Sequence, residues 1–232
     1  GTSGFAYPQW KGRFYPPELP EDDYLGYYAA RLATVEINNT FYRMPKQDVV
    51  AKWRAQAARP DFRFVWKASR RISHQAKLKP PEAHDSMAYL WRMAEPLGEQ
   101  LGPVLIQTPP YLKKDAGLLR EFLAATVPPG RAVAFELASS SWDDDEIDQV
   151  LADRGCARCI ADKDDGTARL VVTAPWVYVR LRKDDYADAE LAGWVERLRA
   201  LGAATAWVFF KHEDTARGVE MAQALAGLAG EA

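Results

Sequence analysis

The chain of 232 residues carries 30 Lys and Arg against 32 Asp and Glu, a formal net charge of −2, and 48% of its residues are hydrophobic. This balance excludes a protein that coats nucleic acid with its whole surface, so any anion binding must come from a local patch. No run of about 18 apolar residues and no signal peptide are visible, so no membrane span is expected. Two cysteines indicate a reducing compartment, and we expect a cytoplasmic protein.

Apolar, β-rich runs alternate with helical patterns along the whole chain, as in repeated strand–helix units. Strands are predicted at residues 1–5, 34–39, 62–68, 103–108, 131–137, 156–162, 176–182 and 205–211. Helices are predicted at residues 22–31, 47–57, 81–93, 116–125, 143–153, 189–201 and 215–228. No Gly/Ser-rich linker divides the chain. The pattern therefore predicts a single domain over residues 1–232, an α/β (β/α)8 TIM-like barrel.

Two details refine this expectation. Residues 164–175 are too few for a normal helix plus its loops, so the barrel should have a short or missing helix after the sixth strand. The competing fold, a doubly wound open sheet, usually shows a phosphate-binding glycine fingerprint after its first strand. The spacing of Gly1 and Gly4 is wrong for that fingerprint, and no helix follows directly.

The second predicted strand carries an unusual polar face. Residues 34–42 alternate apolar and polar side chains, but the polar positions include Glu36 and Asn38. A carboxylate and an amide on one face of a strand are unfavourable to bury unless they meet partners or a ligand. We therefore interpret this strand as part of a site.

Other predicted strands also end in polar residues, and ligands of such barrels bind at the C-terminal ends of the strands. The candidates from these ends are Glu36, Asn38, Lys67, Gln107, Glu136, Asp162, Arg180, Lys211 and His212. Glu36 and Glu136 are predicted to be the acid/base pair, with a pKa near neutral. Lys67 is the third catalytic candidate and, with Arg180 and Lys211, would hold an anion or stabilise negative charge. Asn38 and Gln107 would orient hydroxyl groups. The alternative is a set of satisfied interior salt bridges.

The loop after the third strand is rich in cations. Between Lys67 and Lys79 it includes Arg70, Arg71 and His74, and no acid occurs before Glu82. Such a loop suits a phosphate, a carboxylate or a nucleic-acid backbone. Equally, it could be a solvated loop whose cations pair with the acids of residues 162–165.

Aromatic residues crowd the early loops. Tyr7, Trp10 and Tyr42 are the better candidates for stacking on a sugar ring or a base, because their polar tips can remain hydrated. Phe14 and Tyr15 are more typical of a plug that packs the barrel mouth.

The sequence provides little support for a metal centre. The chain has 3 His, too few for a cluster of zinc ions. We expect no cofactor; the alternative is one Mg²⁺ or Mn²⁺ held by Glu36, Glu136, Asp162 and His212, with which the nearby cations would compete. Cys156 and Cys159 have metal-site spacing, but positions i and i+3 of a strand face opposite ways, which favours two buried thiols.

The chain also resembles a known family. Val35-Glu36-Ile37-Asn38-x-Thr40-Phe41-Tyr42, Arg71-Ile72-x-His74, Phe135-Glu136, Ser141-Trp142 and Tyr178-Val179-Arg180 are similar to motifs of the YecE-like family, domain of unknown function 72. The resemblance spans the whole chain and implies a TIM-like barrel, but no settled reaction. It adds Trp142 to the candidate binding residues.

These observations favour an enzyme with hydrolase-like or isomerase-like chemistry. It would act on a small sugar-like, phosphorylated or nucleotide-derived substrate in a polar pocket. The alternative is a nucleic-acid-binding protein that uses the basic loop of residues 67–79 and the aromatic side chains. A membrane partner is not expected.

Overall fold

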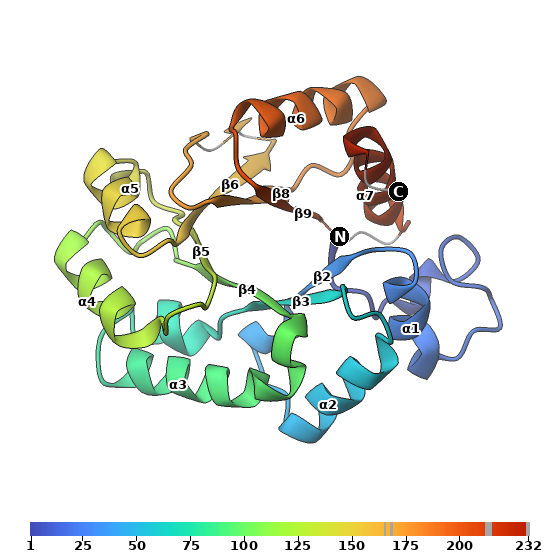
Figure 1. Cartoon of the computed structure of the whole chain (residues 1–232), viewed down its shortest axis with the longest axis horizontal. Helices are drawn as coiled ribbons and strands as arrows, with labels where there is room; N and C mark the ends of the chain where they lie inside the picture. The colour runs from blue at the N-terminus through green and yellow to red at the C-terminus, as the bar shows by residue number, and fades with distance from the viewer. Residues whose placement is uncertain (165, 168, 212–214, 231–232) are drawn as a thin grey trace.

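The protein is a closed barrel of parallel strands surrounded by helices (Figure 1). The structure, a computed structural model, describes residues 1–164, 166–167, 169–211 and 215–230. The strands are β1 (Thr2–Ser3), β2 (Thr34–Ile37), β3 (Arg63–Lys67), β4 (Leu101–Gln107), β5 (Val133–Glu136), β6 (Ala157–Lys163), β7 (Gly166–Thr167), β8 (Trp176–Leu181) and β9 (Thr205–Phe210). The helices are α1 (Tyr24–Ala29), α2 (Gln47–Gln56), α3 (Glu82–Ala94), α4 (Ala116–Thr126), α5 (Asp145–Ala152), α6 (Asp188–Ala200) and α7 (Arg217–Ala229).

The strand order is that of the predicted (β/α)8 fold. The sheet runs β5-β4-β3-β2-β1-β9-β8-β6, and the pairing of β5 with β6 closes it. The expected irregularity is also present: in the described part of residues 164–175 there is no helix, and the short β7 pairs antiparallel with the end of β6. The prediction of the fold class is therefore confirmed.

Alternation of side chains along the strands divides the apolar residues into two cores. The larger core lies between the strands and the helices, where Val35 and Ile37 of β2 contribute. The smaller core fills the barrel and includes Val65, Leu105, Tyr178 and Phe209. The barrel is thus closed through its middle, so a ligand can enter only at one of its two ends.

The two cysteines follow this division. Both are free and buried, with Cys156 in the outer core and Cys159 in the inner one. This confirms the prediction of two buried thiols, and burial raises the pKa of each.

Aspartate side chains cap the starts of two helices. The side chains of Asp115 and Asp144 accept hydrogen bonds from the backbone N–H groups of Leu118 and Glu146, at the starts of α4 and α5. Among the described residues, no helix has both the length and the apolar character needed to cross a membrane.

The early aromatic residues pack against α1. Tyr15 stacks on Tyr24 with a centroid distance of 4.0 Å, and Phe14 contacts Tyr27 and Tyr28. Phe14 and Tyr15 are therefore packing residues, as expected, although they cover the helix rather than plug the barrel.

Candidate functional site

Arg180 links two carboxylates inside the barrel. Its Nη2 donates to Oε1 of Glu36 at 2.8 Å, and its Nη1 donates to Oε2 of Glu136 at 2.5 Å. All three residues are at most 4% exposed. They lie near the C-terminal ends of β8, β2 and β5, which meet at one end of a parallel barrel. The convergence predicted for these residues is therefore observed.

Further polar side chains form hydrogen bonds or an ion pair with the two carboxylates. Glu36 also accepts from Ser3 Oγ at 2.9 Å and from Tyr178 Oη at 2.6 Å. Glu136 also accepts from Gln107 Nε2 at 3.0 Å, and Lys163 Nζ lies 3.7 Å from its Oε1. The two carboxylates are thus well satisfied, as buried charges must be.

These contacts decide the protonation of both acids. Burial raises the pKa of Glu36, but the Arg180 and Arg182 guanidinium groups outweigh burial and hold the pKa at about 2. Burial also raises the pKa of Glu136, but the interactions with its neighbours, led by Arg180, outweigh burial and lower the pKa. Both residues are therefore ionised at neutral pH, and the expectation that they have a near-neutral pKa is wrong. Their geometry assigns them to holding Arg180 rather than to donating protons.

Lys67 lies at the end of β3, at the same end of the barrel, where the C-terminal ends of the strands form its mouth. Its Nζ is 4.5 Å from the centroid of the Phe41 ring, and no carboxylate pairs with it among the described residues. Burial, followed by repulsion from Arg180, lowers its pKa. An amine with a lowered pKa releases its proton more readily than an exposed lysine does.

Two buried polar atoms in this region have no partner in the described part of the chain, namely Oδ1 of Asn38 and Nε of Arg180. Such atoms are unfavourable unless a ligand or water meets them. The Oδ1 of Asn38, just after β2, is an available acceptor for a substrate hydroxyl or amide.

A cavity of about 410 Å³ adjoins the cluster formed by Glu36, Glu136 and Arg180. Glu136, Cys159 and Lys163 line it on the barrel side, and Asp143 and Arg158 line its outer side. The cluster therefore borders a space that can admit a small substrate.

The basic loop divides into an inner and an outer part. His74, on the π-helical turn Arg71–Gln75, contacts the Phe41 ring at a centroid distance of 5.1 Å and lies close enough to Lys67 to have its pKa lowered, mainly by burial and then by that lysine. Arg70 and Arg71 are exposed, outside the barrel interior. No ion pair to either arginine is found among the described residues, and Asp162 pairs instead with Lys183 at 3.4 Å. The paired-loop alternative therefore finds no support there.

The aromatic candidates are placed differently from one another. Tyr7 is half-buried and donates from its hydroxyl to the carbonyl of Ser3, beside the cluster. Tyr42 is 71% exposed and free to stack. Trp10 and Trp142 are fully buried, and the indole N–H of Trp142 donates to the carbonyl of Leu112. The prediction that Trp10 and Trp142 bind a ligand is wrong, because their rings pack in the outer core.

Asp162 does not face the site. In β6 the inward positions are Cys159, Ala161 and Lys163, so Asp162 points outward and accepts from the hydroxyl of Tyr186. The prediction is wrong because the strand extends one residue further than expected and the inward residue at its end is a lysine.

The last strand contributes less than expected. Lys211 follows β9 and pairs with Asp184 at 2.5 Å, with its side chain 40% exposed. It is therefore engaged at the edge of the mouth. His212 lies outside the described residues.

Sequence reasoning missed Arg182, Lys163 and Tyr178. Arg182 Nη1 donates to Ser3 Oγ at 2.8 Å, and it shares the face of β8 on which Tyr178 and Arg180 lie. The period of two along residues 176–182 was the signal that could have identified both neighbours of Arg180.

The donor set for a divalent cation is not brought together. No group of three His, Cys, Asp or Glu side chains suited to a metal ion occurs in the described residues. Asp162 faces away, and Arg180 occupies the carboxylates of Glu36 and Glu136. The described residues therefore do not fit the alternative Mg²⁺ or Mn²⁺ site.

Comparisons with known proteins agree with this architecture. The family model described as "Protein of unknown function DUF72" matches residues 1–232. The UPF0759 protein YecE of Escherichia coli is 38% identical over 109 residues, which are 47% of this chain and 36% of that protein. The match thus spans about a third of the length of that curated relative.

Two solved structures have the same fold. A DUF72 family protein from Thermotoga maritima superimposes with a TM-score of 0.85 at 25% identity, covering 100% of this chain and 98% of that one. A DUF72 family protein from Enterococcus faecalis gives a TM-score of 0.77 at 20% identity, covering 99% of this chain and 94% of that one.

Proposed function

The chain belongs to the family of proteins of unknown function DUF72 and has a TIM-barrel fold, and from this premise we propose that it is an enzyme acting on a small anionic substrate. The anionic group binds among the cations at the C-terminal ends of the strands. The substrate is sugar-like, phosphorylated or nucleotide-derived.

The observation that carries the proposal is an excess of positive charge in the mouth. Among the described residues of the cluster, Glu36 and Glu136 supply two carboxylates, whereas the cations are Lys67, Lys163, Arg180 and Arg182. Two of these four positive charges balance the two carboxylates, both of which Arg180 contacts. The remaining positive charge lies in a partly buried region, where attraction for an anion is stronger than in water.

Lys67 is the residue best suited to proton transfer. Its amine is charged while it holds the anion, but it has a lowered pKa and no carboxylate partner in the described chain, so it gives up its proton more readily than an exposed lysine does. Glu36 and Glu136 are positioning residues in this proposal, because they fix the Arg180 guanidinium. The Oδ1 of Asn38 accepts a hydrogen bond from a hydroxyl of the substrate.

Inorganic phosphate tests the binding step. We expect calorimetric titration at neutral pH to give a dissociation constant in the millimolar range, and Lys67→Met to weaken binding about tenfold, because a charged hydrogen bond contributes about 1.5 kcal/mol. Lys52→Met is the matched control, since Lys52 is exposed and only loosely paired with Asp22 at 3.8 Å. Equal affinity in both variants would contradict anion binding in the mouth.

Turnover is tested separately with a panel of sugar phosphates and nucleotides, followed by NMR spectra of the small molecules. We expect one class to be converted by the natural protein and not by Lys67→Met. Spectra that remain unchanged for every compound, despite phosphate binding, would contradict the enzymatic part of the proposal.

Nucleic-acid binding is a second candidate, favoured by the exposed Arg70 and Arg71, which form no ion pair within the described residues. If these side chains follow a phosphate backbone, the logarithm of the binding constant for single-stranded DNA should fall linearly with the logarithm of salt concentration. Replacing both arginines by alanine should then reduce that slope by about 1.4. Fluorescence anisotropy measures the slope, and a slope equal to that of the natural protein would exclude these arginines.

A further inference from the structure

A second cavity lies at the opposite end of the barrel. Its walls include Arg63, Pro103, Trp176 and Thr205, which stand at or near the starts of β3, β4, β8 and β9. Arg180 is four residues further along β8 than Trp176, so the two ends are about 13 Å apart along the strand. The inner core, with Tyr178 and Phe209, fills the space between them. This cavity is therefore separate from the mouth that contains Lys67.

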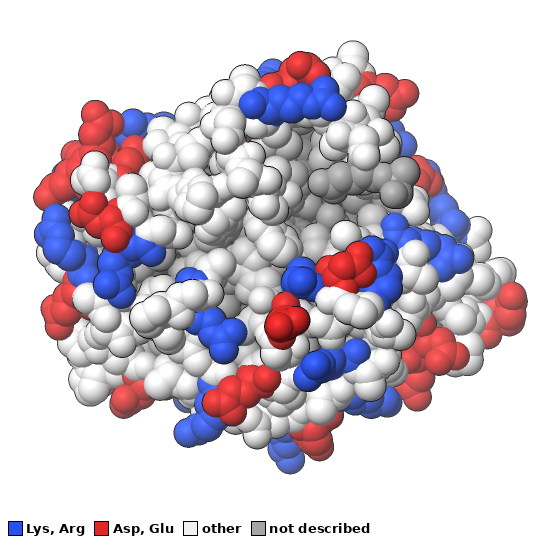
Figure 2. Space-filling view, viewed as in Figure 1, with Lys and Arg blue, Asp and Glu red and all other residues white. Residues whose placement is uncertain are grey.

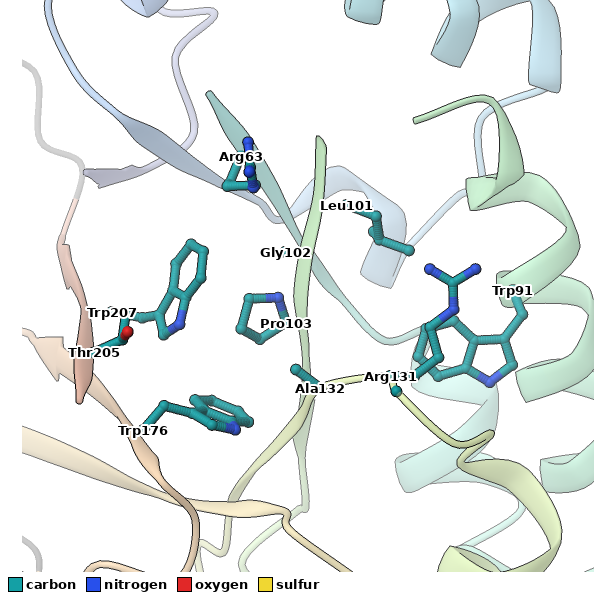
Figure 3. Close-up of a pocket in the computed structure, with 11 residues that line it drawn as sticks. Arg63, Trp91, Leu101, Gly102, Pro103, Arg131, Ala132, Trp176, Thr205 and Trp207 are labelled. Carbon is teal, nitrogen blue, oxygen red and sulfur yellow. The ribbon is translucent and has the colours of Figure 1, made fainter. Parts of the chain in front are cut away.

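Two indole rings form its apolar wall. Trp176 and Trp207 are half-buried and lie with the ring of Pro103 on the same side of β4 (Figure 3). Gly102 adjoins Trp207, since a Cβ at position 102 would lie in ordinary contact with the ring, at 3.4 Å.

These two tryptophans differ in their contacts from five of the chain's other six, the exception being the fully buried Trp66, whose indole N–H also lacks a partner among the described residues. In the part of the chain that the structure describes, neither ring takes part in a ring–ring or cation–π contact, and neither indole N–H donates to a described acceptor. By contrast, Trp91 and Trp142 donate to the carbonyls of Thr126 and Leu112. Trp176 and Trp207 pack in part against the inner core, and the parts of their rings that line the cavity, together with their indole N–H donors, are available to a ligand.

The charges around the cavity have one sign. Among the described residues that line it there is no carboxylate, whereas Arg63 and Arg131 are present. Nη1 of Arg63 donates to the carbonyls of Pro60 and Phe62, at 2.7 and 3.2 Å, which leaves its other N–H groups for a ligand. The nearby Asp61 is paired with Arg59. Figure 2 shows Lys and Arg side chains intermixed with Asp and Glu side chains on the face of the molecule that it draws.

We propose that this cavity is a binding site for a small planar aromatic carboxylate. The ring lies against the indoles of Trp176 and Trp207, and the carboxylate faces Arg63. The volume of about 270 Å³ is sufficient for one six-membered ring with one carboxylate. The proposal is independent of the anion site at the other end.

Sodium benzoate is the probe, and the indole N–H signals in ¹⁵N-correlated NMR spectra are the readout. The 8 tryptophans give one signal each, and Trp176→Phe and Trp207→Phe assign the two of interest. We expect these two signals to shift together and to saturate at millimolar benzoate. Shifts confined to other tryptophans, or no shift at all, would overturn the proposal without any need for a binding-deficient variant.

Three comparisons separate the contributions of ring, charge and position. Benzamide and cyclohexanecarboxylate should each bind about tenfold more weakly than benzoate, because one lacks the charge and the other the aromatic faces. Trp207→Leu should weaken benzoate binding by about the same factor. Lys67→Met, at the other end of the barrel, should not change it. Equal binding of all three compounds, or an effect of Lys67→Met as large as that of Trp207→Leu, would contradict the assigned site.

Discussion

Replacing Arg180 with methionine is expected to lower the free energy of unfolding by about 3–5 kcal/mol, which is the usual effect of removing one partner from a buried ion pair. The variant would leave Glu36 and Glu136 buried with no arginine between them. Methionine keeps most of the side-chain volume, so the loss reports the charge rather than a cavity. Urea unfolding at neutral pH, followed by circular dichroism, measures it.

The control is Arg199→Met, which breaks an ion pair whose side chains are 57% and 72% exposed. An exposed pair contributes at most about 1 kcal/mol, so this variant should remain close to the natural protein. Adding Glu36→Gln and Glu136→Gln to Arg180→Met should restore part of the lost stability, because the unpaired buried charges are then gone. A loss in Arg180→Met as small as in the control would show that the buried network is not under the expected electrostatic constraint.

The barrel was predictable because its signals are local and repeated. Alternation and helical periodicity occur in every strand–helix unit, and an error of one or two residues at a boundary leaves the order of elements unchanged. The same small error is decisive for a site, since a shift of one residue in a strand exchanges the two faces. The sixth strand illustrates this point: it ends at Lys163 rather than Asp162, and the carboxylate expected in the mouth is outside the barrel.

The convergence of Glu36, Glu136 and Arg180 was predictable from strand ends, but their pairing was not. Arg180 is separated from its two partners by 144 and 44 residues, and no local pattern shows which cation a carboxylate will meet. The pKa of Glu36 depends on that choice, so the protonation state was predicted wrongly although the position was predicted correctly. The prediction that Trp10 binds a ligand was wrong for a related reason, because its burial depends on packing against residues distant in the sequence.

Acid should destabilise the protein through Glu36 in a pH range that the structure defines. Its pKa falls from 4.5 to about 2 on folding. A carboxyl with a lowered folded-state pKa contributes stability that is complete above its unfolded pKa. That stability is lost as the pH decreases from about 4.5 towards about 2. A fall of the pKa from 4.5 to about 2 corresponds to about 3 kcal/mol.

Urea midpoints measured between about pH 3 and pH 7 test this expectation. Glu36→Gln is less stable at neutral pH, since it lacks the ion pair with Arg180, but it should lose less stability than the natural protein as the pH falls. Asp61→Asn is the informative control. The pKa of Asp61 is also lowered to about 2, chiefly by the hydrogen bond from Arg59, but this pair is exposed and screened by solvent. The stability of Asp61→Asn should therefore fall with decreasing pH in the same way as that of the natural protein. If the stability of Glu36→Gln also falls in the same way, then the carboxylate held by Arg180 is not the group whose protonation destabilises the fold.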